Sequence, residues 1–353
     1  MKVLYLTKYA RNGASSRMRS FQYFPFLKSK GMHIKHSTLF NEQYLEELYN
    51  GNGISKLNVI KCYLKRVLVL FTVFKYDKIV IEKELFPYFP ASFEKLLALL
   101  QVKYIVDYDD AIFHNYDLSS NKFIKYFLSD KIDKVMRNAY LVVAGNIYLQ
   151  TRAISAGARK TIVIPTVIDS TRYDQKIYSG DKSLVVGWIG TKSTFEKHLM
   201  LLEKMINEIT HKYSNVYFHI IGASDNKVFN EQVRFIPWSE VTEIEEILKF
   251  DVGIMPLEDS PWEKGKCAYK LIQYMACGIP GIASNIGANK ELISTDNGFL
   301  IDTPAGFESV IHSIMADREL LVSKSINAIK TVKKYYTLQI QQEVWYNVLK
   351  NDK

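Results

Sequence analysis

The sequence predicts an α/β protein built from two doubly wound domains, each a parallel β-sheet with helices on both faces. Strand-like apolar runs alternate with helix-like amphipathic runs along the chain, which is the pattern of a parallel sheet. The alternation starts again after a polar segment at 169–183. The length of 353 residues also exceeds what one small core supports. We therefore expect two domains in series.

The first set of elements ends with the apolar run at 161–167. It begins with a strand-like run at 3–7, and Gly31 closes the helical pattern that follows, because glycine past a helix end is a stop signal. The later elements repeat the two periodicities. The predicted strands are 3–7, 78–84, 104–110, 140–146 and 161–167, and the predicted helices are 16–30, 93–100 and 122–138.

The second set begins directly after the polar segment. Its first strand-like run, SLVVGWIG, leads into a long helical pattern, and a last helical stretch ends the chain at 337–350. No low-complexity segment interrupts it. The predicted strands are 183–190, 217–222, 233–238, 251–257, 280–285 and 298–303, and the predicted helices are 195–212 and 242–249.

Composition narrows the class of protein. A hydrophobic content of 48% with 24% charged residues is typical of a soluble globular protein, and the longest apolar run, at 67–74, is too short to span a bilayer. The N-terminus reads as a strand and not as a signal peptide. The three cysteines, Cys62, Cys267 and Cys277, lack metal-ligand spacing and indicate a reducing compartment. The net charge of +9 points to a nucleotide, an anionic lipid or nucleic acid, or to solubility alone.

The segment KGKCAYKLIQYMACGIPGI at 264–282 is the most informative one. Lys264, Lys266 and Lys270 surround a glycine just before and at the start of a helix-like run. The first turn of a helix presents unpaired N–H groups and the positive end of the helix dipole. A phosphate placed there meets amide donors and ammonium groups together, so the segment predicts a diphosphate site.

In doubly wound domains the ligand crevice lies off the carboxyl ends of the strands. We therefore expect functional groups directly after strands. The first such loop contains Asn12-Gly13, which permits a tight turn, and then Arg17 and Arg19 in the first turn of a helix. Cations there are unfavourable unless an anion binds. The alternative is a plain β-to-α turn with solvated arginines.

Three carboxylates follow the strand at 104–110. Asp107, Asp109 and Asp110 are close enough to repel, so at least one should carry a raised pKa. They could ligate a metal, act in acid–base chemistry or bind sugar hydroxyls, and simple helix capping is the alternative. We favour sugar contacts for Asp109.

The turn after 183–190 contains Gly190, Thr191, Lys192 and Ser193, and it resembles a phosphate-cradling turn. Pro237 and Trp238 follow another strand and could hold a nucleobase, although strand-end packing would explain them equally. The stretch 52–75 mixes apolar positions with Lys56, Lys61, Lys65 and Arg66. It is either a basic amphipathic helix that lies on anionic lipid or a surface helix whose apolar side faces the core.

These motifs together resemble the GT-B glycosyltransferases, and in particular family 4, a retaining group. The resemblance covers nearly the full chain and includes the early glycine loop with Arg17. The other matching segments are GWIGTKST at 187–194, KLIQYMACGIP at 270–280, IGANKELI at 286–293 and NGFLID at 297–302. YDDAIF at 108–113 is similar to a bacterial surface-polysaccharide branch.

The resemblance implies two Rossmann-like domains that face a central cleft. Residues 1–170 would bind the acceptor, 171–335 would bind the nucleotide-sugar, and the helix in 336–353 would pack back on the N-terminal domain. It implies donor contacts from Asn289 and Glu291 in the IGANKELI segment. It also implies diphosphate contacts from Lys266 and Lys270, with Asp109 acting beside them.

The chain departs from the family pattern at two glutamates separated by seven residues. Here the first position is Gly265 and the second is Gln273, whose amide can still bond a ribose diol. Asp109 stands where many relatives have a histidine that contacts the donor sugar. The loss of the first glutamate departs from the usual sugar-contact scheme of the family.

The predicted activity is transfer of a sugar, with retention, from a nucleoside diphosphate donor to a hydroxyl acceptor such as a lipid-linked glycan. We expect no cofactor, no metal and no protein nucleophile, since fixed cations and amides can stabilise the leaving diphosphate. Nucleic acid is not an expected partner. The expected location is cytoplasmic, with attachment to the inner face of the membrane as an option. Alternatives are a catalytically silent nucleotide- or lipid-binding subunit and a sugar-nucleotide 2-epimerase.

Overall fold

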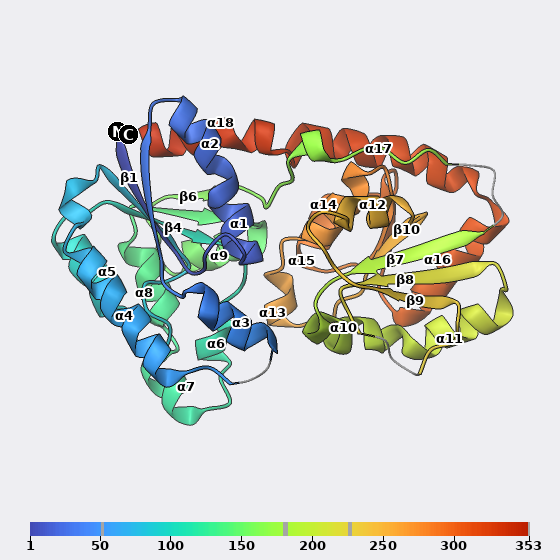
Figure 1. Cartoon of the computed structure of the whole chain (residues 1–353), viewed down its shortest axis with the longest axis horizontal. Helices are drawn as coiled ribbons and strands as arrows, with labels where there is room; N and C mark the ends of the chain where they lie inside the picture. Colours follow the sequence, from blue (N-terminus) through green and yellow to red (C-terminus); the bar gives the residue numbers. More distant parts are fainter. Residues whose placement is uncertain (51–52, 179–182, 225–227, 352–353) are drawn as a thin grey trace. The chain divides into compact units, whose positions relative to one another are not determined.

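The computed structural model of the chain describes residues 1–50, 53–178, 183–224 and 228–351. These residues form two compact units, which are treated separately below (Figure 1). Unit 1 comprises Met1–Thr166, Lys264–Cys267 and Gln341–Lys353. Unit 2 comprises Val167–Glu263 and Ala268–Ile340.

Unit 1 is built on a six-stranded parallel sheet in the order β2-β1-β3-β4-β5-β6. The central strands β3 and β4 are buried along their whole length, which explains the apolar runs at 79–81 and 104–106 inside them. The strands are β1 (Lys2–Thr7), β2 (His33–Thr38), β3 (Lys78–Glu82), β4 (Tyr104–Tyr108), β5 (Leu141–Ala144) and β6 (Thr161–Val163).

Helices flank this sheet. The predicted helix at 16–30 is broken into two α-helices joined by a 3-10 turn, and the predicted helix at 122–138 is broken at Ser129. The helices are α1 (Ala14–Arg19), α2 (Phe24–Ser29), α3 (Glu42–Asn50), α4 (Lys56–Leu70), α5 (Ser92–Leu99), α6 (His114–Asp117), α7 (Lys122–Leu128), α8 (Lys131–Asn138) and α9 (Ile147–Ser155).

Unit 2 is built on a second six-stranded parallel sheet, in the order β12-β11-β10-β7-β8-β9. The doubly wound fold predicted for both halves is therefore confirmed. The strands are β7 (Leu184–Ile189), β8 (Val216–Ile221), β9 (Val233–Ile236), β10 (Val252–Met255), β11 (Gly281–Ser284) and β12 (Gly298–Ile301). The helices are α10 (Lys192–His198), α11 (Glu203–Lys212), α12 (Glu243–Leu248), α13 (Pro261–Lys264), α14 (Tyr269–Ala276), α15 (Gly287–Leu292), α16 (Pro304–Ala316) and α17 (Glu319–Tyr335). The last helix, α18 (Leu338–Lys350), begins in unit 2 and continues in unit 1 from Gln341.

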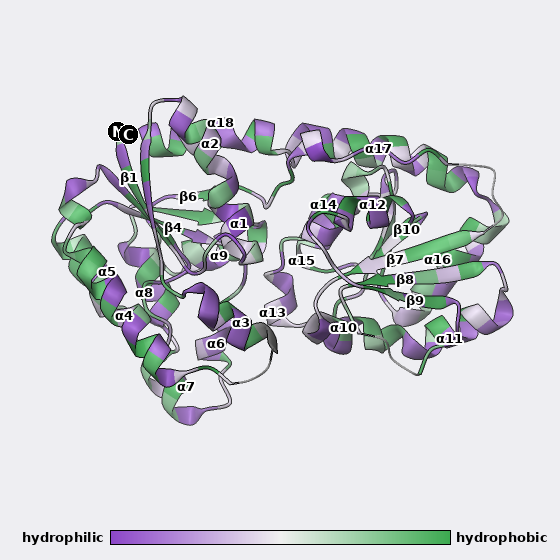
Figure 2. Cartoon of the chain, in the orientation of Figure 1, coloured by the Kyte–Doolittle hydropathy of each residue, from purple (hydrophilic) through white to green (hydrophobic). Residues whose placement is uncertain are grey.

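The sheet of unit 2 has a core on each face. Leu184, Val186 and Trp188 point to one face of β7, since alternate side chains of a strand share a side, and pack in a cluster with residues of α10, α11 and α16. Leu271 and Met275 of α14 belong to a second cluster with residues of α12, α15 and α17. Figure 2 shows apolar strands between helices that are apolar on one side only.

The end of α18 belongs to unit 1. Trp345 is fully buried and packs edge-on against Tyr23, at 6.1 Å between ring centroids. Tyr346 contacts Phe26 in the same way, and Glu343 pairs with Lys30 at 3.2 Å. These contacts hold the last helix against α2 and the turn before it.

Helix α4 packs on unit 1 with a mixed side, on which the polar Asn58 and Arg66 flank a small apolar cluster that includes Cys62, and it leaves its leucines outside. Asn58, Cys62 and Arg66 are buried, whereas Leu57 and Leu68 are largely exposed. Neither interpretation of 52–75 describes α4 fully, because Cys62 packs inward with Leu39 and Phe40 whereas the leucines face outward. Residue 52 of this stretch lies outside the described residues. Within the described residues, no helix has the length and apolar character needed to cross a bilayer.

Candidate functional site

The carboxyl ends of four neighbouring strands meet at one edge of the unit 1 sheet. Because β1, β3, β4 and β5 are parallel and adjacent, the residues that follow them lie close together. These residues are Lys8, Lys83, Asp109 and Gly145. The sequence analysis singled out Asp109 and missed Lys83.

Lys83 and Asp109 form an ion pair at this edge. Lys83 Nζ lies 2.9 Å from Asp109 Oδ1, and the Ser15 hydroxyl donates to Asp109 Oδ2 at 2.5 Å. Burial alone would raise the pKa of Asp109, but the Lys83 ammonium and the Ser15 hydroxyl outweigh it and hold the pKa at about 2. Lys83 adopts a left-handed backbone, φ 67°, which is strained for a residue with a side chain. Asp109 is thus a fixed carboxylate at neutral pH.

Asp110 is held more loosely. Its Oδ2 lies 3.5 Å from Lys83 Nζ, and its Oδ1 lies 4.0 Å from Lys266 Nζ. Burial raises the pKa of Asp110, and the neighbouring charge of Asp109 adds to this effect. The pKa values of the two adjacent carboxyls therefore shift in opposite directions.

The predicted arginines have different roles. Arg19 is buried and makes a two-point ion pair with Asp107, with Nε at 3.0 Å and Nη2 at 2.5 Å from the carboxylate oxygens. It also donates to the Ile164 carbonyl at 2.7 Å. Arg19 and Asp107 thus link α1 to the sheet. Arg17 lies on α1 and is largely buried.

The loop before α1 is closed by Gly13. A Cβ at this position would lie 2.5 Å from Tyr9 Cβ, so the close turn requires glycine. The hydroxyls of Ser15 and Ser16 do not cap the helix. They donate to carboxylates instead, and Ser16 Oγ lies 2.7 Å from Glu82 Oε2. Burial raises the pKa of Glu82.

The lysine-rich turn Lys264–Cys267 belongs to unit 1. Asn146 donates from Nδ2 to the carbonyls of Gly265, at 3.1 Å, and Lys266, at 3.0 Å. The Cys267 thiol donates to the Asp109 carbonyl at 3.0 Å. A Cβ on Gly145 would lie 2.4 Å from Cys267 Sγ. The turn is thus clamped onto the ends of β4 and β5.

Gly265 explains one departure from the family pattern. A Cβ at this position would lie 2.4 Å from Ala111 Cβ and 2.7 Å from the Ala111 amide nitrogen. A glutamate there would collide with backbone that cannot rotate away. The missing carboxylate therefore follows from the close packing of this turn on the loop after β4.

His114 is held by two partners. Its Nδ1 lies 2.7 Å from Asp117 Oδ1, and its Nε2 lies 2.9 Å from the Tyr148 hydroxyl. Both ring nitrogens are therefore engaged within unit 1.

The strand ends of unit 2 form a separate glycine-lined edge. Gly190 follows β7, and a Cβ there would lie 2.5 Å from the Trp188 ring. Gly222 follows β8 with φ 86°, and a Cβ there would lie 2.3 Å from the Gly190 carbonyl oxygen and 3.3 Å from Trp238 Cβ. Both positions require glycine because protein atoms occupy the space of a side chain, so the backbone turns tightly at this edge. Pro237 and Trp238 border this edge, and the Trp238 indole donates to Glu243 at 2.9 Å.

The turn after Gly190 leads into α10. Thr191 caps this helix, because its hydroxyl accepts from the Thr194 amide at 3.4 Å. Ser193 is hydrogen-bonded to Thr191 at 3.1 Å between the hydroxyl oxygens. Lys192 is exposed and lies 4.0 Å from Glu196. The hydroxyls of this turn have local partners, whereas the Lys192 ammonium extends into solvent.

Helix α14 begins without a side-chain cap. Ala268 at its N-cap has φ 51°, a strained left-handed conformation, so the first-turn amides receive no side-chain acceptor. Lys270 Nζ lies 4.3 Å from the centroid of the Trp188 ring. Gln273 is buried, and its amide donates to the Tyr173 hydroxyl at 3.2 Å.

The IGANKELI segment follows β11. Asn289 is buried and donates to the Ser284 carbonyl at 3.1 Å, a contact within the turn, while Glu291 is exposed on α15. A cavity of about 190 Å³ lies at the ends of β10, β11 and β12, and Asp259, Asn285 and Thr303 are among its lining residues.

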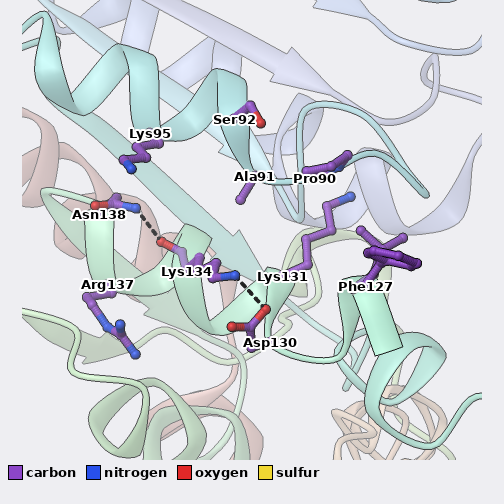
Figure 3. Close-up of a pocket in the computed structure, with 11 residues that line it drawn as sticks. Pro90, Ala91, Ser92, Lys95, Phe127, Asp130, Lys131, Lys134, Arg137 and Asn138 are labelled. Atoms are coloured by element: carbon purple, nitrogen blue, oxygen red, sulfur yellow. Dashed lines mark hydrogen bonds and ion pairs between the residues drawn. The ribbon is translucent and has the colours of Figure 1, made fainter. Parts of the chain in front are cut away.

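Two further polar groups were missed by sequence reasoning. Glu263 is fully buried in unit 2, where it pairs with Lys197 at 2.5 Å and lies 3.4 Å from His198 Nε2. In unit 1 a cavity of about 380 Å³ is lined by Lys95, Lys134 and Arg137, away from every predicted site residue (Figure 3). Their sequence signals, isolated charges on ordinary helices, do not distinguish them from surface residues.

The predicted site residues therefore divide into two sets. Gly13, Arg17, Asp109 and Lys266 are in unit 1, and the others are in unit 2. In the described part of the chain, no group of three or more His, Cys, Asp and Glu side chains could hold a metal ion.

Comparison with known proteins identifies the fold. Residues 183–317 match the family described as Glycosyl transferases group 1. A glycosyltransferase from Rickettsia africae is similar in structure over 100% of this chain and 99% of its own, with a TM-score of 0.70 at 16% identity. HepE of Anabaena, in complex with UDP and glucose, is similar over 99% of both chains, with a TM-score of 0.69 at 16% identity. Sucrose-phosphate synthase of Thermosynechococcus elongatus covers 99% of this chain and 98% of its own, with a TM-score of 0.68 at 12% identity. By sequence, no curated protein matches the chain.

Proposed function

We propose, from the premise that this chain is a glycosyltransferase with a group 1 domain on a GT-B fold, that it transfers a sugar from a nucleoside diphosphate donor to a hydroxyl acceptor. The observation that carries the proposal is the edge of unit 2. There the group 1 domain brings glycine-lined strand ends, an uncapped helix and Lys270 together in one unit. HepE is similar in fold and binds UDP-glucose, which makes a uridine nucleotide the first donor to test.

The leaving group of such a reaction is a nucleoside diphosphate. Its developing charge is best stabilised by donors and cations that are already in place. We assign this role to the first-turn amides of α14 and to Lys270, with Lys192 and the Gly190–Ser193 turn beside β7. The diphosphate role of Lys266 stays a prediction, since its backbone is fixed within unit 1. A catalyst of this kind has no requirement for a metal.

The nucleobase is assigned to the edge formed by Pro237 and Trp238. Trp238 is about half exposed and is oriented by its bond to Glu243. Sugar hydroxyls are assigned to Asp109 and Asp110, because both carboxyls follow β4 and are held beside Lys83, at 2.9 and 3.5 Å from its Nζ. Glu291 is exposed on α15 and keeps its proposed donor contact, whereas the side chain of buried Asn289 bonds within its own turn.

Retention at the anomeric carbon, a lipid-linked glycan acceptor and a role in surface polysaccharide synthesis complete the proposal. They come from the resemblance of YDDAIF and KLIQYMACGIP to family 4. With this acceptor the protein would work in the cytoplasm at the inner face of the membrane.

One observation favours a second function, that of a catalytically silent subunit. The two family glutamates are absent, and the amide of Gln273 donates to Tyr173. Such a subunit would bind a nucleotide without consuming a donor.

A two-step experiment separates these functions. Thermal shift with UDP, GDP, ADP and their sugar derivatives identifies the nucleotide, because a bound ligand raises the melting temperature. The donor is then incubated with membrane-extracted glycolipid, and nucleoside diphosphate is quantified. If the protein transfers the sugar, the release of nucleoside diphosphate depends on the acceptor. NMR of the product then reports the anomeric configuration of the new linkage. A nucleotide that binds without release in every combination supports the silent subunit.

The diphosphate assignment has its own test. Lys270→Ala should weaken UDP binding roughly tenfold or more, since a charge-assisted contact contributes about 1.5–3 kcal/mol. Uridine binding should not change, because uridine has no phosphate. Lys204→Ala, an exposed lysine on α11, is the control. Equal losses for UDP and uridine would refute the assignment.

A further inference from the structure

Helix α4 presents an apolar stripe to solvent. Leu57, Ile60, Leu64 and Leu68 are spaced by three or four residues and therefore share one side of the helix. Each of them is more than half exposed, as is Phe71 directly after the helix. A stripe of this size is uncommon on a surface that meets only water.

The outward direction of this stripe is fixed by polar contacts on the opposite side. Arg66 is buried and donates to the carbonyls of Thr7, at 2.7 Å, and Ser37, at 3.1 Å. Asn58 exchanges side-chain hydrogen bonds with Asn41 at 2.8 and 3.0 Å. Rotating α4 to bury its leucines would leave these polar groups unpaired. The leucines are therefore held outward.

Helix α7 adds exposed aromatic side chains at the same end of unit 1. Phe123 is 73% exposed and Tyr126 is 81% exposed. Asn121 caps the helix and fixes its start. Figure 1 places α4 and α7 at the same end of the unit.

The loop between β3 and α5 connects the two helices. On one side, the Tyr63 hydroxyl of α4 donates to the Pro87 carbonyl at 2.8 Å, and the Tyr63 ring contacts Phe89. On the other, Pro90 and Phe127 of α7 line one cavity. We call the surface formed by Leu57, Ile60, Leu64, Leu68, Phe123 and Tyr126 the α4–α7 face.

The exposed charged residues within helices α4, α5 and α7 have one sign, whereas the acid Asp130 follows α7 and the acid Glu47 contacts Ser55 before α4. The exposed charged residues of these helices are Lys56, Lys61 and Lys65 on α4, Lys122 and Lys125 on α7, and Lys95 on the neighbouring α5. All residues of α4, α5 and α7 are described, and none of these helices has an exposed acid, because Glu94 is buried. Figure 2 shows polar and apolar residues side by side along α4.

The charged residues that line the cavity beside α7 are also mainly basic. Lys95, Lys131, Lys134 and Arg137 line it together with a single acid, Asp130, and Phe127 lies at its border (Figure 3). Lys131 is neutralised by the buried Glu84. Lys95 and Arg137 remain as cations that line the same cavity as Phe127 of α7.

We infer that the α4–α7 face binds the surface of an anionic lipid bilayer. Leucines and aromatic rings flanked by lysines match the boundary between acyl chains and charged headgroups. A second copy of the chain would bring like charges together around the apolar stripe, which disfavours self-association. The inference builds on the membrane location proposed above and names the residues that would make the contact.

Vesicle flotation of the full chain tests this inference without donor or acceptor. The vesicles are pure phosphatidylcholine or its mixture with phosphatidylglycerol. We expect binding only to the mixture, and its loss at about 1 M salt, where the Debye length is about 3 Å. Leu57→Ser/Leu64→Ser/Leu68→Ser and Phe123→Ser/Tyr126→Ser should each lower the bound fraction roughly tenfold, and Lys61→Gln/Lys65→Gln should lower it severalfold.

Matched controls lie on unit 2. Val241→Ser removes a side chain that is 91% exposed, and Lys204→Gln removes one exposed charge. Both should bind vesicles as the unchanged protein does, and circular dichroism melting should be the same for all variants. Absent binding to the anionic vesicles, or α4 and α7 variants that bind like the controls, would overturn the inference. A change in sedimentation velocity with no change in flotation would assign the face to a second copy and overturn it as well.

The outcome is independent of sugar transfer. A protein that binds UDP and releases no product but floats with anionic vesicles would refute the proposed function and leave the α4–α7 face in place. A protein that transfers sugar to a water-soluble acceptor but never floats with anionic vesicles would support the proposed function and refute the role of the α4–α7 face.

Discussion

Lys83 Nζ lies 2.9 Å from Asp109 Oδ1, and this ion pair joins the ends of the neighbouring strands β3 and β4. The Ser15 hydroxyl completes the arrangement from α1. Three segments that are far apart in the sequence thus converge on one carboxylate. Its ionisation is the property of unit 1 that can be measured most directly.

The pKa of Asp109 should depend on Lys83. In the unchanged protein we expect a value of about 2 from carboxyl NMR titration. In Lys83→Met the pKa should rise, because burial then acts without the opposing ammonium. Asp302→Asn in unit 2 is the control. An unchanged Asp109 pKa in Lys83→Met would contradict this account.

The same shift has a consequence for stability. The folded-state pKa of Asp109 is lower than that of an unfolded aspartate, so its contribution is complete above about pH 4 and is lost as the pH falls towards 2. Asp109→Asn lacks this pH-dependent contribution to the free energy of unfolding. Its apparent melting temperature should therefore fall less between pH 5 and pH 3 than that of the unchanged protein, as measured by circular dichroism.

Asn146 should hold the Lys264–Cys267 turn independently of its capping role. Asn146→Asp keeps an oxygen that caps α9 but replaces the amide donor to the Gly265 and Lys266 carbonyls. Hydrogen exchange at 264–268 should quicken roughly tenfold, about 1.4 kcal/mol, with little change in α9. Asn121→Asp, at the cap of α7, is the control. If hydrogen exchange quickened equally in α9 and in the turn, the effect would come from the cap of α9, and the prediction for the turn would be wrong.

Restoring the two family glutamates should have unequal effects. Gln273→Glu keeps an oxygen that can accept from the Tyr173 hydroxyl, so its melting temperature should change little. Gly265→Glu places a side chain against the Ala111 backbone and should destabilise unit 1 by about 1–3 kcal/mol or more. Circular dichroism melting of both variants checks this, and a Gly265→Glu protein as stable as the parent would contradict the packing argument.

The last helix should stabilise unit 1 through Trp345. Trp345→Ala removes a fully buried ring beside Tyr23 and should cost about 3–5 kcal/mol. Tyr335→Ala, a half-exposed ring on α17, should cost far less. Limited proteolysis followed by mass spectrometry would assign the loss to unit 1, and equal melting temperatures for the two variants would exclude a buried role for Trp345.

The strands could be predicted from the sequence wherever they are buried. β3 and β4 contain continuous apolar runs because both faces of a parallel sheet are covered. β2 escaped prediction because it is an edge strand without a buried residue, and its sequence HIKHST has no apolar face. Helix α9 was also missed, since its short apolar pattern follows β5 after only two residues, Gly145 and Asn146.

The candidate site was predictable only in part. Asp109 and Gly190 follow apolar strands, which is visible in the sequence. Lys83 was not predictable, because its contact depends on the order of β3 and β4 in the sheet and on a left-handed backbone. The sequence also did not show which side of α4 faces the sheet. That side is fixed by Arg66, which donates to carbonyl groups at the ends of β1 and β2, and these contacts depend on the tertiary structure.

The central claim is that the chain consumes a nucleoside diphosphate sugar. Its most direct test is the rate of nucleoside diphosphate release, measured for each donor with and without the membrane-extracted acceptor. The account predicts that one donor releases nucleoside diphosphate at a rate that rises at least tenfold with the acceptor and falls in Lys270→Ala. Tight nucleotide binding with no release, from any donor and with or without acceptor, would contradict it.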